Sequence, residues 1–190
     1  MKYICLFLYF VMILFVVGCG PSSKNVKDSA DSISSHDVQT PLEEVSEGDF
    51  VYRLVTDQEE YKEGSSVSIY AELEYIGSND QITIYHAASP FHFPLEEKTR
   101  GYQIGYGMEE PLLNTTLVKN KPIREQYKGS GGYGSKEDAN YEAFVKKIMS
   151  NHFPKGYYVM DGFADFYVET SDGKRKYEIT ATIDFKVEEK

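Results

Sequence analysis

The sequence predicts a mainly β protein in which two antiparallel sheets pack face to face and one α-helix interrupts the strands. Apolar residues occupy every second position in the segments 67–75 and 177–187, which is the period of a half-buried strand. An Asp-Gly pair at 172–173 separates two β-rich runs, which is typical of a hairpin turn. One segment near residue 145 has helical spacing instead.

The two alternating segments are the clearest strands. The inward face of the first is expected to consist of Val67, Ile69, Ala71, Leu73 and Tyr75. The inward face of the second is expected to consist of Tyr177, Ile179, Ala181, Ile183, Phe185 and Val187. The second strand should form a hairpin with residues 163–169 through a turn at 171–174.

Shorter strands are expected at residues 50–55, 81–86, 102–108 and 115–118. About seven short strands, each with one polar and one apolar face, predict an immunoglobulin-like antiparallel β-sandwich with one inserted α-helix.

The helix is expected to begin after Asp138, a residue type that caps helix N-termini, and to end before Pro154 and Gly156. Its apolar stripe would consist of Tyr141, Phe144, Val145, Ile148, Met149 and His152. We expect this helix in the connection that crosses between the two sheets, where it would close one end of the core.

The chain begins like an exported protein. Lys2 precedes an apolar run over residues 4–17, which is too short for a comfortable membrane span and typical of a secretory signal over residues 1–18. The run ends in Val16, Val17, Gly18 and Cys19, which resembles the lipobox of bacterial lipoproteins. The resemblance implies cleavage between Gly18 and Cys19 and attachment of a diacylglyceryl group to the Cys19 sulfur. An uncleaved membrane helix that happens to end in cysteine is the alternative.

A polar segment follows the lipobox. Residues 20–48 contain no aromatic residue and scatter their aliphatic residues without a period, so residues 19–48 are predicted to be a lipidated cysteine and a flexible tether of up to about 95 Å. A short helix near residues 42–45 is the alternative. The β-sandwich domain would then cover residues 49–190. Cys5 would be lost with the signal and Cys19 alkylated, which leaves the mature protein no free thiol.

The composition disfavours a nucleic-acid partner. The chain has 20 Lys and Arg against 30 Asp and Glu, a formal charge of −10, and no basic stripe to neutralise phosphates. No G-x-S-x-G or S-x-x-K pattern of a serine hydrolase is present. We expect no catalytic residue, no cofactor and no metal.

Two patterns suggest a small ligand. Gly129, Gly131 and Gly134 satisfy G-x-G-x-x-G, but no buried strand precedes them, so a glycine loop is favoured over a nucleotide site. His86 and His92 flank a bend at Pro90 and could hold a metal, but no frame supplies further ligands. The favoured interpretation is a turn whose neighbours Phe91 and Phe93 close the end of the sandwich.

Acidic pairs and outward-facing tyrosines are the remaining candidates for a site. The pairs Glu96 and Glu97, Glu109 and Glu110, and Asp161 and Asp165 could form a calcium or acid–base site, but a solvated surface is favoured. Tyr70 and Tyr85 lie on the outward faces of their strands, where they could anchor a partner protein or pack against neighbouring strands.

Several short motifs carry a family resemblance. They are Leu73-Glu74-Tyr75, Ser89-Pro90-Phe91, Gly131-Gly132-Tyr133 and 153–158, Phe-Pro-Lys-Gly-Tyr-Tyr. Together with the lipobox and the tether, they resemble the small uncharacterised lipoproteins of Bacillus and its relatives, the YhfM-like type. This family implies no established activity. A more distant likeness in architecture is to the intracellular proteinase inhibitor family of Bacillus.

These observations lead to two functional hypotheses. The first is a non-enzymatic lipoprotein on the outer face of the cytoplasmic membrane of a Gram-positive bacterium, which binds another envelope protein. The second is an inhibitor of extracellular proteases that acts through a loop such as 129–136.

Overall fold

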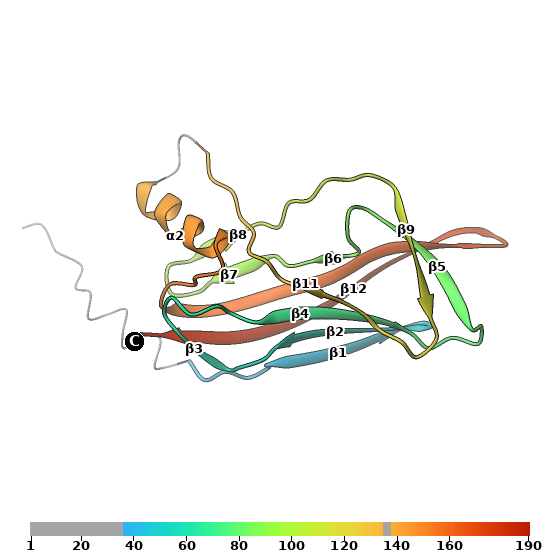
Figure 1. Ribbon diagram of the computed structural model, residues 1–190, viewed down its shortest axis with the longest axis horizontal. Helices are drawn as coiled ribbons and strands as arrows, with labels where there is room; N and C mark the ends of the chain where they lie inside the picture. The colour runs from blue at the N-terminus through green and yellow to red at the C-terminus, as the bar shows by residue number, and fades with distance from the viewer. Residues whose placement is uncertain (1–35, 135–137) are drawn as a thin grey trace, which may run out of the picture.

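The computed structural model describes residues 36–134 and 138–190, and it is a mainly β fold in which two sheets pack as a sandwich (Figure 1). This confirms the predicted fold class. The signal, the lipobox with Gly18 and Cys19, the tether up to residue 35, and residues 135 and 136 of the proposed inhibitor loop lie outside the described residues.

The smaller sheet has four antiparallel strands in the order β1-β2-β4-β10. Their bounds are Leu42–Glu47 (β1), Phe50–Thr56 (β2), Ile69–Tyr75 (β4) and Ile123–Gln126 (β10). The larger sheet has the order β3-β12-β11-β5-β9, and three short strands extend it beside β11. Its main strands are Glu60–Lys62 (β3), Gln81–His86 (β5), Leu113–Val118 (β9), Gly156–Thr170 (β11) and Gly173–Glu188 (β12). The short strands are Phe91–His92 (β6), Leu95–Glu97 (β7) and Tyr102–Ile104 (β8).

The core lies between the two sheets and consists of the residues that the alternating pattern predicted. All five predicted inward residues of 67–75 are at most 1% exposed, and all six of 177–187 are at most 5% exposed. The hairpin is also confirmed, because β11 and β12 pair from Gly156 and Val187 to the turn after Thr170. Apolar burial at about 25 cal/mol per Å² explains why this pattern sets the strand register.

The helix α2 (Ala139–Met149) lies in the connection between β10 and β11, which belong to different sheets, as predicted. The Asp138 side chain accepts a hydrogen bond from the Asn140 amide at 3.2 Å and caps the N-terminus. Phe144, Val145 and Ile148 are buried, and α2 lies over one end of the sandwich near β7 and β8 (Figure 1).

The structure corrects the predicted boundary at residue 49. Residues Leu42–Glu47, predicted as tether, form strand β1 and pair with β2 along its whole length. Main-chain hydrogen bonds to β2 hold this strand in place. Only one of its apolar side chains, Val45, packs against the core, so the sequence shows no apolar period here. The folded domain therefore begins before Leu42.

The prediction of about seven strands, all antiparallel, is also wrong. The described residues contain twelve strands, and β3 pairs with β12 in parallel. Three of the additional elements, β3, β6 and β7, have two or three residues each, which is too short to show a period. The strand expected at residues 102–108 is shorter than predicted, because β8 ends at Ile104.

The segment before β1 is attached to β12 by a buried carboxylate. Asp184 is 5% exposed and accepts hydrogen bonds from the amides of Gln39 at 2.9 Å and Thr40 at 2.6 Å, and from the Tyr157 hydroxyl at 2.7 Å. Burial and the hydrogen bond to Asp184 raise the pKa of Tyr157 to about 12. The His36 ring stacks on Tyr157 at 4.5 Å. We call these contacts the N-terminal clamp.

Candidate functional site: an aromatic pocket on the larger sheet

A pocket of about 540 Å³ lies on the outer face of the larger sheet, over β5, β11 and β12. The loop before β9 forms its other wall through Met108, Glu110, Pro111 and Leu112. The pocket faces away from the core because the odd-numbered residues of β11 point outward, while the even-numbered ones are buried between the sheets. A cavity of this size fits a small molecule or a large side chain.

The floor of the pocket is a stacked tyrosine pair. Tyr85 on β5 and Tyr167 on β11 are directly opposite each other in the strand register, and their rings lie 4.9 Å apart at an interplanar angle of 9°. The Lys174 ammonium lies 4.1 Å from the Tyr167 ring centroid and donates a 3.0 Å hydrogen bond to its hydroxyl, which raises the pKa of Lys174. The cross-strand interpretation of Tyr85 therefore holds, and both tyrosines also line the pocket.

His92 belongs to a second aromatic group. Its ring stacks on that of Phe163, with the ring centroids 4.4 Å apart and an interplanar angle of 6°. Tyr106 meets the edge of the same imidazole at 6.2 Å. Burial lowers the pKa of His92 below its ordinary value, because the charged imidazolium loses solvation among these rings, while Asp165 acts in the opposite direction.

The lowered pKa of His92 gives a testable pH dependence. We expect the ring to titrate below about 6.5, its midpoint in an unfolded chain, when it is followed by NMR. Because the unfolded state then takes up the proton first, the stabilisation by neutral His92 is complete above pH about 6.5 and declines as the pH falls. Asp165→Asn should lower the midpoint further. A midpoint at or above 6.5 would contradict the burial of the ring.

His86 lines the same pocket, but both of its ring nitrogens have partners. One lies 2.8 Å from the Thr115 hydroxyl and the other 2.8 Å from the Ala87 carbonyl oxygen. No group of three or more His, Cys, Asp or Glu side chains that could hold a metal ion occurs in residues 36–134 and 138–190. Phe91 and Phe93 are each 1% exposed, so the residues beside Pro90 do enter the core as expected.

The predicted solvated carboxylates are not all solvated. Glu97 is fully buried, and it accepts hydrogen bonds from the amides of Thr99 at 2.9 Å and Arg100 at 2.8 Å. These hydrogen bonds hold the turn between β7 and β8, so the role of the Glu97 carboxylate is structural. Asp161 accepts from the Thr182 hydroxyl at 2.7 Å, and Asp165 lies on the pocket wall.

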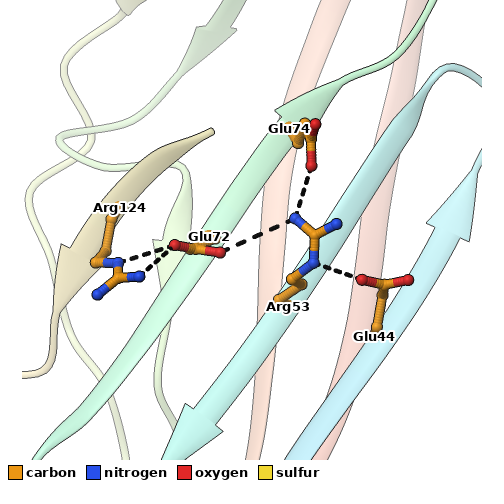
Figure 2. Close-up of polar contacts among 5 residues, drawn as sticks. All are labelled: Glu44, Arg53, Glu72, Glu74 and Arg124. Atoms are coloured by element: carbon orange, nitrogen blue, oxygen red, sulfur yellow. Dashed lines mark hydrogen bonds and ion pairs between the residues drawn. The ribbon is translucent and has the colours of Figure 1, made fainter. Parts of the chain in front are cut away.

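The outer face of the smaller sheet carries a network of ion pairs, and Figure 2 shows its five members. Arg53 on β2 contacts Glu44 at 2.5 Å and Glu74 at 2.7 Å, and Glu72 joins Arg53 at 3.9 Å to Arg124 at 2.7 Å (Figure 2). Ion pairs at the surface contribute only about 0–1 kcal/mol each, and here two arginines offset two of the three glutamates across four strands. This face therefore offers few free charges to a ligand.

Tyr70 lies beside this network on β4. The Arg124 guanidinium is 3.9 Å from the centroid of its ring, which is a cation–π contact between neighbouring strands. Tyr70 therefore packs against its own sheet.

The glycine loop packs on the end of α2. Gly129 has a φ of +87°, and a Cβ at this position would lie 2.6 Å from the Met149 carbonyl oxygen. Gly131 lies against Val145 and Ile104, and Ser130 donates its amide to the Tyr127 hydroxyl at 2.9 Å. β10, which precedes the loop, is an edge strand of an antiparallel sheet, so the βαβ unit of a dinucleotide site is absent here.

Tyr85, His86, His92, Glu110 and Asp165 could be named from the sequence as separate candidates, but not as neighbours in one pocket. The missed residues of the pocket are Ala87, Met108, Pro111, Leu112, Phe166, Tyr167, Lys174 and Lys176. The sequence did contain one signal for part of the pocket. Tyr167 faces outward on β11, and the Asp-Gly turn brings β12, with Lys174 and Lys176, beside it.

Comparisons with known proteins add little to this geometry. No protein-family model matches the chain, and no curated protein matches its sequence. A solved structure described as a crystal structure of a protein from Archaeoglobus fulgidus is similar with a TM-score of 0.34 and 13% identity, over 80% of this chain and 98% of the other. In the described residues, no helix has the length and apolar character needed to cross a membrane. The resemblance to YhfM-like lipoproteins stays a prediction.

Proposed function

We propose that this chain is a lipoprotein on the outer face of the cytoplasmic membrane of a Gram-positive bacterium, and that its sandwich is a non-enzymatic binding module for another envelope protein. The aromatic pocket is the observation that supports binding. It combines stacked rings with charged groups of both signs, because Lys174, Lys176, Glu110 and Asp165 also line it.

The pocket suits a flat apolar group, such as an aromatic side chain of the partner. Stacking of such a ring on the face of Tyr85 that does not contact Tyr167 would add about 0.5–1.5 kcal/mol to the burial of the ring. The charged wall groups are already partnered in part, because Lys176 lies 3.4 Å from Asp165 and Lys174 contacts Tyr167. A ligand of high charge is therefore disfavoured.

Photo-crosslinking on intact cells tests the binding site. We expect p-benzoylphenylalanine at Met108, inside the pocket, to capture an envelope protein, and the same group at Met149 on α2, which is 45% exposed, to capture none. Tyr167→Ala in the same chain should reduce the capture severalfold, because it removes half of the floor. Equal capture from both positions, or none from Met108, would contradict the proposal.

The anchor makes a separate prediction. Cys19→Ala removes the sulfur that would carry the diacylglyceryl group, so the variant should take up no labelled palmitate and should be found unprocessed or released from the membrane. Cys5→Ala is the matched control, since this residue would be removed with the signal. Unchanged labelling of the Cys19→Ala protein would refute the anchor.

Strand β1 shortens the proposed tether. The chain between Cys19 and His36, the first described residue, spans at most about 60 Å when fully extended. The domain would therefore work closer to the membrane than a tether ending at residue 48 would allow.

A further inference from the structure

Strand β9 is an edge strand that carries none of the usual protection against pairing with another chain. It lies at one end of the larger sheet, and in the described part of the chain its only strand partner is β5. One further bridge, from the Lys121 amide to the Val118 carbonyl at 3.1 Å, closes the last residue of β9. Its sequence, Leu-Asn-Thr-Thr-Leu-Val, contains no charge and no proline. Edge strands present unpaired main-chain groups, and natural proteins usually block them with charges, proline or short length.

The other outer strands are short or charged, and β6 and β8, which each pair with one strand only, have two and three residues. β1 carries three glutamates among its six residues, β3 has only three residues, and β10 has four residues, two of which are charged. In its lack of protection, β9 thus differs from the other outer strands of the same molecule. β9 is the one long, uncharged edge among the described strands.

Exposed apolar side chains collect at the same edge. Leu112 is 68% exposed, Leu113 43% and Val118 40%, and these three are among only seven large apolar residues that are exposed in the described chain. Leu112 immediately precedes β9, and the other two are its first and last residues. Burying them would be favourable at about 25 cal/mol per Å² of apolar area.

We propose that β9 pairs antiparallel with β9 of a second copy of this chain, with Thr115 opposite Thr115 of that copy. A two-fold axis perpendicular to the sheet requires opposed residues to point to the same face, so their numbers must have the same parity. In this register Leu112 lies opposite Val118 of the second copy, and Leu113 lies opposite Leu117. Leu112 and Val118 then each gain an exposed apolar neighbour, while Leu113 lies beside Leu117, which is buried in its own core.

Charge complementarity favours this occupant over an unrelated strand. Glu109 and Glu110 precede β9, and Lys119 and Lys121 follow it. None of the four belongs to an ion pair among the residues that the structure describes. Antiparallel self-pairing brings the acidic end of each copy to the basic end of the other, whereas parallel pairing would place like charges together.

This inference does not depend on the proposed anchor or on the ligand of the pocket. In the proposed dimer, the two-fold axis perpendicular to the sheet places the two pockets on the same side of one continuous sheet.

Disulfide trapping of the purified full chain in mild detergent tests the register. Thr115→Cys should form a covalent dimer under a mild oxidant, because opposed positions on paired strands lie within the distance that a disulfide requires. Thr116→Cys is the matched control, because it lies on the other face and faces Asn114 of the second copy, so we expect at least fivefold less dimer. The parent chain corrects for Cys5 and Cys19. Equal trapping at both positions, or none at Thr115, would overturn the proposal.

A second measurement does not need an introduced cysteine. The molar mass of the full chain in detergent should correspond to a dimer, and Val118→Lys should weaken dimer formation about tenfold or more by placing charges in the apolar seam. Adding Leu112→Glu to Val118→Lys should restore the dimer, because the two charges then face each other across the axis. Circular dichroism shows whether each variant is folded. A monomeric parent chain, or a dimer that is insensitive to Val118→Lys, would overturn the proposal.

Discussion

Replacing Ile183 with aspartate is expected to unfold the domain or nearly so. Ile183 lies on β12 opposite Met160, and both side chains are fully buried between the sheets. A carboxylate at this position would have to enter the apolar core without a partner or take up a proton, and either outcome costs several kcal/mol, of the order of 4. Total stability of a domain is only about 5–15 kcal/mol. Urea unfolding of the purified protein measures the loss.

The matched control is Thr180→Asp on the same strand, because Thr180 is exposed and points to the opposite face. We expect its effect on the free energy of unfolding to stay within about 0.5 kcal/mol. Thr182 is a poorer control, since its hydroxyl donates to Asp161 and a carboxylate there would repel it. Similar losses for Ile183→Asp and Thr180→Asp would contradict the register of β12.

Gly129→Ala should produce the second large effect. The new Cβ would lie 2.6 Å from the Met149 carbonyl oxygen and 2.7 Å from that of Ile148, both of which are main-chain atoms at the end of α2. The residue would also have to keep a φ of +87°, which costs an L-amino acid about 1–2 kcal/mol. Because either the loop or the helix must shift, we expect a loss of about 3 kcal/mol or more, measured by thermal or urea unfolding.

Gly132→Ala is the control for this loop, because a Cβ at Gly132 meets no atom within 4 Å and its φ is ordinary. It should leave stability nearly unchanged. The pair also distinguishes the two interpretations of the glycine pattern. A structural loop needs glycine only where it contacts the helix, whereas a phosphate cradle needs open main-chain amides along the loop. Equal tolerance at both positions would contradict the packing of Gly129 on α2.

The strands that could be predicted are those in which burial on one face dominates the sequence. The apolar alternation of β4 and β12 sets their register without any knowledge of their neighbours, and the predicted range 81–86 coincides with β5. β1 and β10 are held mainly by main-chain pairing to a neighbour, and their polar side chains face outward. Apolar alternation, the strongest local signal for a strand, is therefore missing in strands that are stabilised mainly by hydrogen bonds to a neighbouring strand.

The pocket could be predicted only in fragments. Tyr85 and Tyr167 are far apart in the sequence and become neighbours through the pairing of β5 with β11. His92 gains its ring partner in the same way, from Phe163 on β11. Single residues could thus be named as outward-facing or as histidines, but the order of strands in the larger sheet brings them together, and this order was not predictable from periodicity.

The N-terminal clamp determines how the domain would respond to tension on its N-terminus. Gln39 and Thr40 precede β1, so a pulling force reaches their hydrogen bonds to Asp184 before it loads the β1–β2 ladder. Rupture of these few bonds would also release the Thr40 carbonyl from the Asp184 amide and uncover the backbone edge of β12. Under tension the clamp would therefore break first, while the core between the sheets remains folded.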